Sequence, residues 1–342
     1  MMATEMQRWA LTSIGKDHLE RQRLEIPVPA PFEVLVKVRA VALNHRDKMV
    51  IESGRGLPLQ FPFTPCSDMA GEVIALGDGV TRFGVGDQII TTFAPGWIDG
   101  RRPGNARTPS YETLGGFYPG VLAEYVALPE GWLVSSPTLL EPSHACTLPC
   151  AGVTAWCALI EHAGLQAGDS VLIPSTGGVG LFGVQVAKAS GAEVIVCGRP
   201  ENEDRVMALG ANHYVRCTRD EDWTEAVLHI TQGQGVDHVL DVVGGVNLGR
   251  AVKVAAVGGH ICQIGALGGF DATIPAMPMM LKNLSLHGVG TGSRCSLERL
   301  VRAVDGTGLA PVIGAQYDFM DFPAALAHLE RGAFGKIILN VS

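Results

Sequence analysis

The stretch that most constrains the fold runs from residue 170 to 199. It opens with Val171-Leu172-Ile173, an apolar run typical of a parallel strand buried on both faces. After a glycine-rich turn, apolar residues recur at helical spacing over 179–190, and Gly191 stands where a helix cap belongs. Residues 193–197 then predict a second strand. A strand, a turn, a helix and a parallel strand within about 30 residues predict one βαβ unit.

The turn in this unit is a variant of the dinucleotide-binding fingerprint, with serine at the first glycine position. It consists of Ser175, Thr176, Gly177, Gly178, Val179 and Gly180. Gly177 and Gly178 would let the backbone approach a pyrophosphate, and Gly180 would let the helix pack closely on the strand. The helix N-terminus would direct free N–H groups at the phosphates. Because the turn lies between a strand and a helix, it favours dinucleotide binding over a plain structural turn.

The end of the second strand indicates which dinucleotide is bound. An acidic residue there would hydrogen-bond the adenosine ribose, whereas a small neutral residue followed by arginine accommodates a 2′-phosphate. The chain has Gly198 and Arg199 at this point, with no carboxylate until Glu201. A guanidinium can pair a phosphate through its fork, although a solvated surface arginine is the alternative. The sequence predicts NADPH in preference to NADH.

Length and composition exclude several classes of protein. The 342 residues suit two domains rather than one, and 47% hydrophobic with 18% charged residues is an ordinary globular composition. The net charge of −8 argues against nucleic acid or an anionic membrane surface as a partner. No apolar signal core is present near residue 1, and no segment approaches about 20 uninterrupted apolar residues. Eight scattered cysteines predict a reducing, cytoplasmic location.

The pattern of predicted strands and helices changes along the chain. Over 1–148, short β-like runs are broken by turns rich in glycine and proline, which predicts an all-β, barrel-like domain. Over 149–289, strand and helix patterns alternate, which predicts a doubly wound parallel sheet of about six strands. The tail, 290–342, has a helix and a last strand, and we expect it to return to the first domain because the sheet is already complete. The cofactor would then lie between the two domains.

Taken together, these features resemble the medium-chain dehydrogenase/reductase superfamily over nearly the whole chain. The matching motifs are Gly71-Glu72-Val73, Gly84-x-Gly86-Asp87, the segment 148–155, the turn 175–180 and Phe334-Gly335-Lys336. The resemblance implies an α/β fold with a GroES-like β-barrel domain and a Rossmann domain, and it is strongest for the zinc-free quinone oxidoreductase, or zeta-crystallin-like, branch. It also implies a homodimer joined through the strand near 284–289, since an exposed edge strand needs a partner or a cover.

The residues at the family's zinc-ligand positions predict a site without metal. Zinc enzymes of the family use a cysteine, a histidine and a later cysteine, whereas this chain has Asn44, Ser67 and Cys150 at those positions. Asparagine and serine are poor zinc ligands. The region near 90–120, where a structural zinc lobe would fall, contains no cysteine. Two other conceivable ligand groups are Cys66, Asp68 and Cys150, and His144, Cys146 and Cys150. Buried free thiols are the better interpretation of these cysteines.

The expected absence of zinc favours particular substrates. Without a metal, the developing oxyanion depends on hydrogen-bond donors, each worth about 2.7–4 kcal/mol. Simple ketones collect charge on one oxygen, whereas quinones and conjugated enones spread it over a π-system. The sequence therefore predicts an NADPH-dependent oxidoreductase acting on a small quinone or α,β-unsaturated carbonyl. A zinc-independent alcohol or ketone dehydrogenase and a non-catalytic NADPH-binding protein remain as alternatives.

The resemblance also implies candidate site residues. Asn44 would donate to the substrate oxygen at the nicotinamide end, or else cap a turn. His45 would contact the pyrophosphate or supply a proton, and Asp47 would organise the site. The candidate cofactor contacts are Thr154, Ser175, Thr176, Gly177, Gly178, Val179, Gly180, Gly198, Arg199, Val243, Gly244, Ile264, Gly265, Ala266 and Lys336. The long loop 93–120, rich in aromatic and arginine residues, is either a substrate lid or a surface loop anchored by its aromatics.

Overall fold

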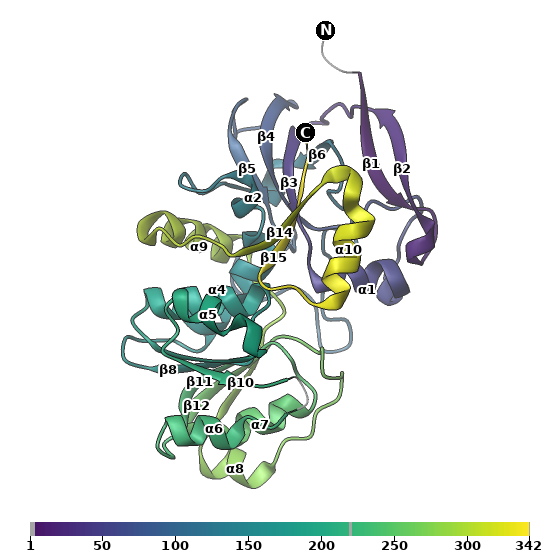
Figure 1. Cartoon of the computed structure of the whole chain (residues 1–342). Coiled ribbons are helices and arrows are strands. Elements are labelled where there is room, and N and C mark those ends of the chain that lie inside the picture. Colours follow the sequence, from purple (N-terminus) through teal and green to yellow (C-terminus); the bar gives the residue numbers. More distant parts are fainter. Residues whose placement is uncertain (1–3, 219–220, 342) are drawn as a thin grey trace. The chain divides into compact units, whose positions relative to one another are not determined.

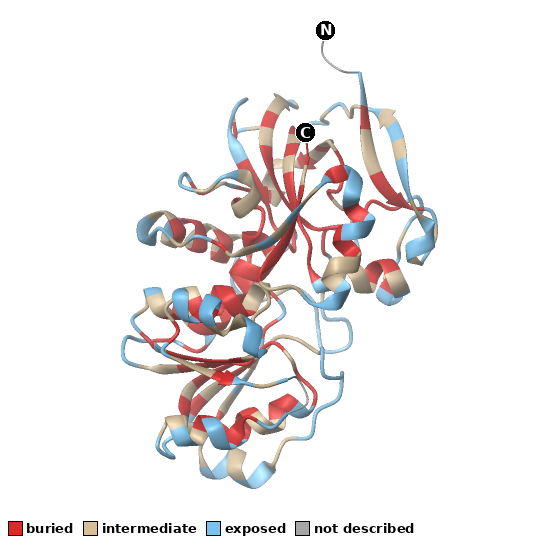
Figure 2. Cartoon of the chain, in the orientation of Figure 1, coloured by how far each residue is buried: buried red, intermediate tan, exposed pale blue. Residues whose placement is uncertain are grey.

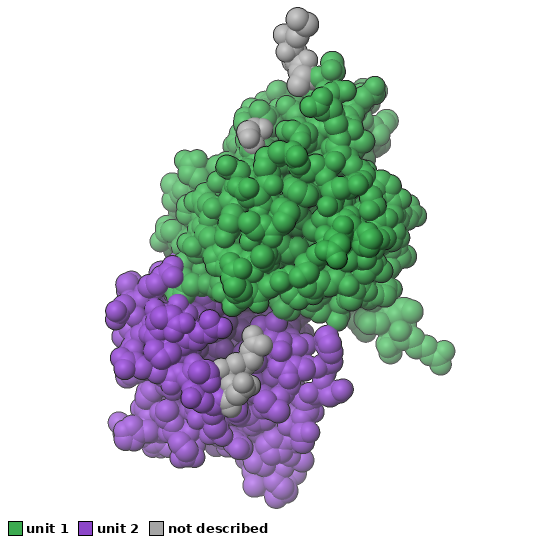
Figure 3. Space-filling model, turned by 45° about the vertical axis from the view of Figure 1, so that its right-hand side comes forward, with its two compact units in different colours: residues 1–153, 291–342 green, residues 154–290 purple. Residues whose placement is uncertain are grey.

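The computed structural model describes residues 4–218 and 221–341. The chain divides into two compact units, which Figure 3 shows in different colours. Unit 1 comprises Met1–Val153 and Thr291–Ser342, and unit 2 comprises Thr154–Gly290. Residues 1 and 342, which bound the predicted outer domain, lie outside the described residues.

Unit 2 is built on a parallel sheet. Among its described residues, six strands form the order β10-β9-β8-β11-β12-β13. Their bounds are β8 (Ser170–Ile173), β9 (Glu193–Gly198), β10 (His213–Arg216), β11 (Val236–Asp241), β12 (Ala255–Gln263) and β13 (Ser285–Gly288). The strand order reverses between β8 and β11, and ligands bind at such a switch point in doubly wound sheets. The predicted doubly wound sheet is therefore confirmed.

Helices cover both faces of this sheet. Helices α4 and α5 lie on one face, and α6, α7 and α8 lie on the other (Figure 1). Their bounds are α4 (Gly178–Ala189), α5 (Glu203–Ala208), α6 (Thr224–Ile230), α7 (Val246–Val254) and α8 (Ala276–Leu281). Leu172, Ile195 and Val239 are fully buried in the sheet, as strands covered on two faces require. Figure 2 shows the strands of this sheet coloured mostly as buried. This burial on both faces explains why the strands appear in the sequence as continuous apolar runs.

Unit 1 is mainly antiparallel. A hairpin of β1 (Glu5–Leu11) and β2 (Leu19–Glu25) accompanies a sheet of order β14-β15-β3-β4-β5-β7, in which β6 also pairs with β3. The strands of this sheet are β3 (Glu33–Ala42), β4 (Asp68–Leu76), β5 (Gln88–Thr91), β6 (Tyr125–Pro129), β7 (Leu133–Ser135), β14 (Ile313–Asp318) and β15 (Lys336–Asn340). The α-helices of this unit are α1 (His45–Ser53), α2 (Pro142–Ala145), α9 (Arg294–Thr307) and α10 (Phe322–Arg331).

The C-terminal tail completes the core of unit 1. Strand β15 pairs antiparallel with β3, with Leu339 opposite Val41. The Trp9 indole packs edge-on against Phe322 and donates its N–H to the Phe319 carbonyl at 2.8 Å. The predicted helix and last strand of the tail are both present. Helix α9 and strand β14 were not predicted.

One helical stretch crosses the boundary between the two units in sequence. Pro142–His162 includes α2, η4 (Leu148–Gly152), α3 (Val153–Trp156) and η5 (Cys157–His162). Its 21 residues are long and apolar enough to span a membrane by length and composition, although polar residues interrupt the apolar run. However, 72% of its most apolar window is buried inside the protein, as in the core helix of a globular fold.

Candidate functional site

The predicted phosphate-binding turn lies between β8 and α4 in unit 2. Gly177 is the N-cap of α4 and has no side chain that could cap the first turn of the helix. The first N–H groups of an α-helix have no partner within the helix, so these donors are available to an anion. Ser175, at the first glycine position of the fingerprint, accepts a hydrogen bond from the Gly177 N–H through its Oγ at 3.1 Å. The serine thus stabilises the turn from within.

The glycines of the turn differ in what they must accommodate. A Cβ atom on Gly180 would lie 2.4 Å from the Ser175 carbonyl oxygen, a distance that real contacts do not show. A Cβ atom on Gly177 would lie 3.5 Å from the Ser175 Oγ, which is an ordinary contact. The protein's own packing therefore requires glycine at 180 and not at 177. A ligand approaching the backbone closely would explain the glycine at 177.

The segment that follows β9 carries the predicted cofactor-specificity residues. A Cβ atom on Gly198 would lie 2.5 Å from the Tyr214 hydroxyl oxygen and 2.9 Å from Thr176 Cγ2. The Tyr214 hydroxyl donates to the Arg199 carbonyl at 2.7 Å and so fixes the backbone of this segment. The Arg199 side chain is 62% exposed and lies 3.9 Å from Glu201. Its guanidinium is open to a ligand, although the surface ion pair matches the alternative interpretation.

The loops after β11 and β12 pack backbone against backbone. A Cβ atom on Gly265 would lie 1.9 Å from the Val242 carbonyl oxygen, and one on Gly244 would lie 2.3 Å from the Gly265 carbonyl oxygen. The Gly268 N–H donates to the Val243 carbonyl at 2.8 Å. These contacts bring together the predicted residues Val243, Gly244, Ile264, Gly265 and Ala266. All of them follow the carboxyl ends of neighbouring parallel strands.

Asp241 organises these loops and was not among the predicted residues. Its Oδ1 accepts hydrogen bonds from the Val243 and Gly244 N–H groups at 3.0 and 2.9 Å, and from Asn247 Nδ2 at 2.8 Å. Asp241 is fully buried, and its Oδ2 has no hydrogen-bond partner among the described residues. A carboxylate at the end of an apolar strand, followed after two valines by a Gly-Gly pair, was the available sequence signal. Thr154, the remaining predicted contact in unit 2, is buried in α3.

The predicted catalytic residues of unit 1 surround a buried amine. Lys336, on β15, donates from Nζ to Asn44 Oδ1 at 2.6 Å and to the Leu43 carbonyl at 2.7 Å. Since an ammonium only donates, the Asn44 atom facing it must be the oxygen. The amide nitrogen Nδ2 is then a buried donor, and an Asn44 side-chain hydrogen bond opposes the rise in the pKa of the neighbouring Asp68. Asn44 and Lys336, 292 positions apart in sequence, form one unit of the site.

Two carboxyl groups flank this amine. Asp47 Oδ2 accepts a hydrogen bond from the Asn44 N–H at 2.8 Å, which caps α1. Burial raises the pKa of Asp47 to about 6, with the Arg46 charge opposing and the Asp68 charge adding to the rise. Burial also raises the pKa of Asp68, against the nearby Lys336 charge. Asp68 accepts hydrogen bonds from the Ser67 Oγ at 2.5 Å and the Cys150 N–H at 3.1 Å.

Arg46 joins α1 to the long loop of unit 1. Its guanidinium donates to the Leu114 carbonyl at 2.9 Å and to Thr113 Oγ1 at 2.9 Å. It also stacks 5.0 Å from the centre of the Phe93 ring and 5.8 Å from that of Tyr111. No local pattern links Arg46 to residues 65 to 69 positions away, so sequence analysis missed this role. The loop is anchored here, and the aromatic lid stays a prediction.

The zinc-ligand positions of the family do not offer a zinc-binding donor set here. Asn44 Oδ1 is taken by the Lys336 ammonium, and Ser67 donates its hydroxyl proton to Asp68. Burial, with the charge of Asp68, raises the pKa of the Cys150 thiol, which opposes the thiolate that zinc requires. Among the described residues, no group of three or more His, Cys, Asp and Glu side chains is placed to hold a metal ion. These residues do not fit a catalytic zinc.

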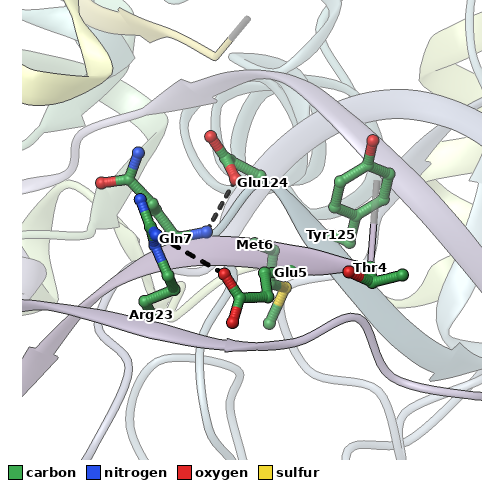
Figure 4. Close-up of a pocket in the computed structure, with 7 residues that line it drawn as sticks. All are labelled: Thr4, Glu5, Met6, Gln7, Arg23, Glu124 and Tyr125. Atoms are coloured by element: carbon green, nitrogen blue, oxygen red, sulfur yellow. Dashed lines mark hydrogen bonds and ion pairs between the residues drawn. The ribbon is translucent and has the colours of Figure 1, made fainter. Parts of the chain in front are cut away.

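His45 is the remaining candidate catalytic residue of unit 1. His45 begins α1 and is exposed. A depression of about 470 Å³ on unit 1 is lined by Thr4, Glu5, Met6, Gln7, Arg23, Glu124 and Tyr125 (Figure 4). Its polar groups are engaged with one another: the Gln7 N–H donates to Glu124 at 2.7 Å, and Arg23 lies 3.5 Å from Glu5. None of the predicted site residues lines it.

Two family models match separate parts of the chain. Residues 30–138 match the family model described as the alcohol dehydrogenase GroES-like domain. Residues 178–306 match the model described as zinc-binding dehydrogenase. The predicted pairing of a GroES-like domain with a Rossmann domain is confirmed by these matches and by the parallel sheet of unit 2.

Individual relatives extend over nearly the whole chain. A zinc-type alcohol dehydrogenase-like protein of Schizosaccharomyces pombe is 31% identical over 338 residues, which cover 96% of each chain. The quinone oxidoreductase of Homo sapiens is 26% identical over 328 residues, covering 93% of this chain and 92% of its own. A solved structure from Sinorhizobium meliloti 1021, provisionally described as an alcohol dehydrogenase, is 50% identical with a TM-score of 0.96. That comparison covers 99% of this chain and 100% of the other.

Proposed function

Because the chain belongs to the medium-chain dehydrogenase/reductase superfamily, as a quinone oxidoreductase-like enzyme, we propose that it transfers a hydride from NADPH to a quinone or an α,β-unsaturated carbonyl without catalytic zinc. NADPH would supply the hydride, and the chain would bind, orient and stabilise charge. Unit 2 would hold the dinucleotide at the turn 175–180 and at the loops after β11 and β12. The substrate oxygen would meet the donors of unit 1.

The observation that carries the proposal is the contact between Lys336 and Asn44. A Lewis acid would stabilise charge on a single carbonyl oxygen, but the Asn44 oxygen faces an ammonium group instead of a metal ion. The Asn44 Nδ2 group is a buried donor whose amide is oriented by Lys336. One neutral donor stabilises a partial charge better than a full one, which favours acceptors that delocalise charge. Quinones and conjugated enones meet this condition.

Asp47 and His45 have supporting roles in the proposal. Asp47 fixes the start of α1 through the Asn44 N–H, and thereby the position of the Asn44 side chain. We propose His45, exposed at the first turn of α1, as the group that returns a proton to the product or contacts the pyrophosphate. His45→Gln separates these roles. Loss of kcat at unchanged nucleotide affinity supports the proton role, and weaker nucleotide binding supports the pyrophosphate contact.

The experiment that tests the proposal is a screen of NADPH oxidation with and without a strong chelator. The acceptors are quinones, conjugated enones, saturated ketones and aldehydes. We expect turnover with quinones or enones that is insensitive to the chelator, together with little turnover of saturated ketones. Inactivity toward every quinone and enone would overturn the proposal. Loss of activity on chelation, restored by zinc, would overturn its metal-independent part.

The choice of NADPH rests on Arg199 and is tested separately. Its exposed guanidinium follows Gly198, and no carboxylate stands at the end of β9. Arg199→Ala should raise the KM for NADPH about tenfold, because a charge-assisted hydrogen bond to the 2′-phosphate is lost. The KM for NADH should change little. Arg205→Ala, an exposed arginine on α5, is the matched control and should leave both values unchanged. Equal effects of Arg199→Ala on the two cofactors would refute the assignment.

The names of several relatives favour a second candidate, a zinc-independent alcohol or ketone dehydrogenase. The relative from Schizosaccharomyces pombe and the structure from Sinorhizobium meliloti 1021 carry alcohol dehydrogenase names. Oxidation of alcohols by NADP⁺ that persists in chelator, without quinone or enone reduction, would select this candidate. Tight NADPH binding without turnover of any acceptor or alcohol would instead select a non-catalytic binding protein.

We also propose a homodimer formed through β13. This strand ends the sheet of unit 2, and its Leu286 is 39% exposed. Unpaired strand edges need a partner or a cover. Light scattering coupled to size-exclusion chromatography should give twice the mass of the chain. A monomer at micromolar concentration would exclude this assembly.

A further inference from the structure

Two cysteines meet at the carboxyl ends of neighbouring strands in unit 2. Cys197 is the penultimate residue of β9 and is 2% exposed, and Cys217 follows directly after β10 and is half-buried. The parallel register sets Val215 opposite Cys197, and the Cys217 N–H donates to the Gly198 carbonyl at 2.8 Å. The side chains of residues 215 and 217 point to the same face as that of 197. Cys197 belongs to the buried core cluster of unit 2, and Cys217 packs against the same cluster.

The two thiols have different environments. The neighbouring Cys197 thiol lowers the pKa of Cys217, burial and Glu221 oppose this, and Arg250 and the Gly198 backbone add to the lowering. The same contact, with burial, raises the pKa of Cys197. A partly exposed thiol with a lowered pKa beside a buried second thiol is the arrangement of a reactive cysteine and its resolving partner. The other cysteines differ, because burial raises the pKa of Cys146, Cys150 and Cys262.

We propose that Cys197 and Cys217 are a modification site that forms a reversible disulfide when the protein meets a hydroperoxide. The Cys217 thiolate attacks the hydroperoxide, the O–O bond breaks, and Cys217 becomes a sulfenic acid while the leaving oxygen takes a proton. The Cys197 thiol then loses its proton, its sulfur displaces the hydroxyl from Cys217, and water leaves as the S–S bond forms. Two thiols lose two electrons in total, and the hydroperoxide gains them.

The position of the two cysteines predicts that the disulfide affects cofactor binding. Cys197 directly precedes Gly198 and Arg199, and a link to Cys217 would tie the end of β9 to the segment after β10. The Tyr214 hydroxyl already holds the Arg199 carbonyl from β10. Oxidation should therefore shift the Arg199 segment and weaken NADPH binding. This consequence rests on the proposed function, whereas formation of the disulfide does not.

The disulfide can be detected by peptide mapping of the full chain. The protein is treated with graded hydrogen peroxide, quenched, alkylated and digested with trypsin without reduction. Arg205 and Arg216 lie between the two cysteines, so trypsin separates their peptides unless a disulfide joins them. We expect a joined Cys197–Cys217 peptide, alkylation of the other six cysteines, and full reversal by dithiothreitol. Oxidation at other cysteines with Cys197 and Cys217 both alkylated would overturn the proposal, as would a Cys217 sulfinic acid beside free Cys197.

Variants and a second reagent complete the test. Cys217→Ser should abolish the joined peptide, whereas Cys295→Ser, at another half-buried cysteine, should leave it unchanged. Phenylarsine oxide, which bridges neighbouring thiols, should bind the untreated protein and protect both cysteines from alkylation. It should not protect the remaining cysteine in Cys217→Ser. If phenylarsine oxide does not protect the pair, the two thiols are not neighbours and the proposal fails. This test uses the unmodified protein, so it does not depend on whether a cysteine variant folds.

Kinetic measurements distinguish the effect on NADPH binding from formation of the disulfide. The oxidised protein should show a KM for NADPH about tenfold higher, the effect of losing one charge-assisted contact, and dithiothreitol should restore it. The KM for NADH should change less. A joined peptide with an unchanged KM for NADPH would leave the modification site intact and remove its effect on the cofactor. A tenfold rise in the KM for NADPH on oxidation, without the joined peptide, would overturn the proposed modification site.

Discussion

At the scale of single residues, Lys336 is the cation on which the buried part of the unit 1 site depends. It donates to Asn44 and to the Leu43 carbonyl, and its charge opposes the rise in the pKa of Asp68. Lys336→Met should lower the free energy of unfolding by about 3 kcal/mol, because buried acceptors and carboxylates lose their donor and counter-charge. Urea unfolding followed by circular dichroism measures this loss.

The pH dependence of the Lys336→Met effect distinguishes loss of charge from loss of packing. At pH 5 the carboxyl groups of Asp47 and Asp68 take up protons more readily, since burial raises the pKa of each. The destabilisation should then be smaller at pH 5 than at pH 8. Lys37→Met, at a half-buried lysine on β3, is the control and should not shift the urea midpoint. A loss that does not change between the two pH values would refute the electrostatic explanation.

Asp47 should give the stability of unit 1 a characteristic pH slope. The carboxyl titrates at 3.8 when unperturbed and at about 6 in the folded protein. Between these values the folded state holds a proton that the unfolded chain has lost, so stability falls as the pH rises. The total fall is about 3 kcal/mol, and it is complete above pH 6. Asp47→Asn should reduce this fall while its side-chain oxygen still accepts from the Asn44 N–H.

Urea unfolding at pH 4, 5, 6 and 7 measures this slope in the parent and in the variant. Asp68 has a raised pKa as well, so a smaller slope of the same sign should persist in Asp47→Asn. Asp78→Asn, at an exposed carboxylate of unit 1, should retain the full slope. An Asp47→Asn slope equal to that of the parent would show that Asp47 ionises normally in the folded state.

At the scale of elements, the turn between β8 and α4 allows two glycines to be compared. Gly180→Ala would place Cβ 2.4 Å from the Ser175 carbonyl oxygen and should destabilise unit 2 by about 1–3 kcal/mol. Gly177→Ala meets only an ordinary contact at 3.5 Å and should leave stability unchanged. If a pyrophosphate approaches the backbone at this point, Gly177→Ala should nevertheless weaken NADPH binding. Thermal melting and fluorescence titration with NADPH measure the two effects, and unchanged binding in Gly177→Ala would exclude close approach there.

The elements that could be predicted are those whose signals are local. The β8, α4 and β9 segments were predictable because a buried run, a glycine turn and helical spacing lie within one short stretch. Helix α9 also carries local signals that were not used: Ser293 caps it, and Leu297, Leu300 and Val304 share a buried face. Strand β14 also carries a short local signal, because half-buried Ile313, Ala315 and Tyr317 alternate with exposed residues at the period of a strand.

The candidate site was predictable only in part, for the same reason. Family motifs placed Asn44, Asp47 and Lys336 among the candidates, but not the hydrogen bond between Asn44 and Lys336, which spans 292 positions. The Arg46 contacts with the 93–120 loop depend on the tertiary fold in the same way. Contacts of this kind follow from strand pairing, here that of β15 with β3, and no periodicity in the chain encodes it.

At the scale of the whole molecule, each unit has its own core, and unit 1 is built from two separate segments of the chain. Strand β15 pairs with β3, and Phe322, Ile337 and Leu339 are buried in the core of unit 1. A chain ending at residue 153 should therefore fail to fold. A chain in which a short glycine–serine linker joins 153 to 291 should fold, because α9 contacts η4 within the same unit.

The complementary fragment, residues 154–290, should fold alone and bind NADPH with an affinity that Gly177→Ala reduces. Circular dichroism and the cooperativity of thermal unfolding test all three fragments, and fluorescence titration tests binding. Because the last strand supplies both a neighbour for β3 and the buried Lys336, the linked form of unit 1 should also keep the pH slope assigned to Asp47. A cooperative transition in the fragment 1–153 would show that unit 1 does not need its tail, and that the contact between Lys336 and Asn44 serves the site and not the fold.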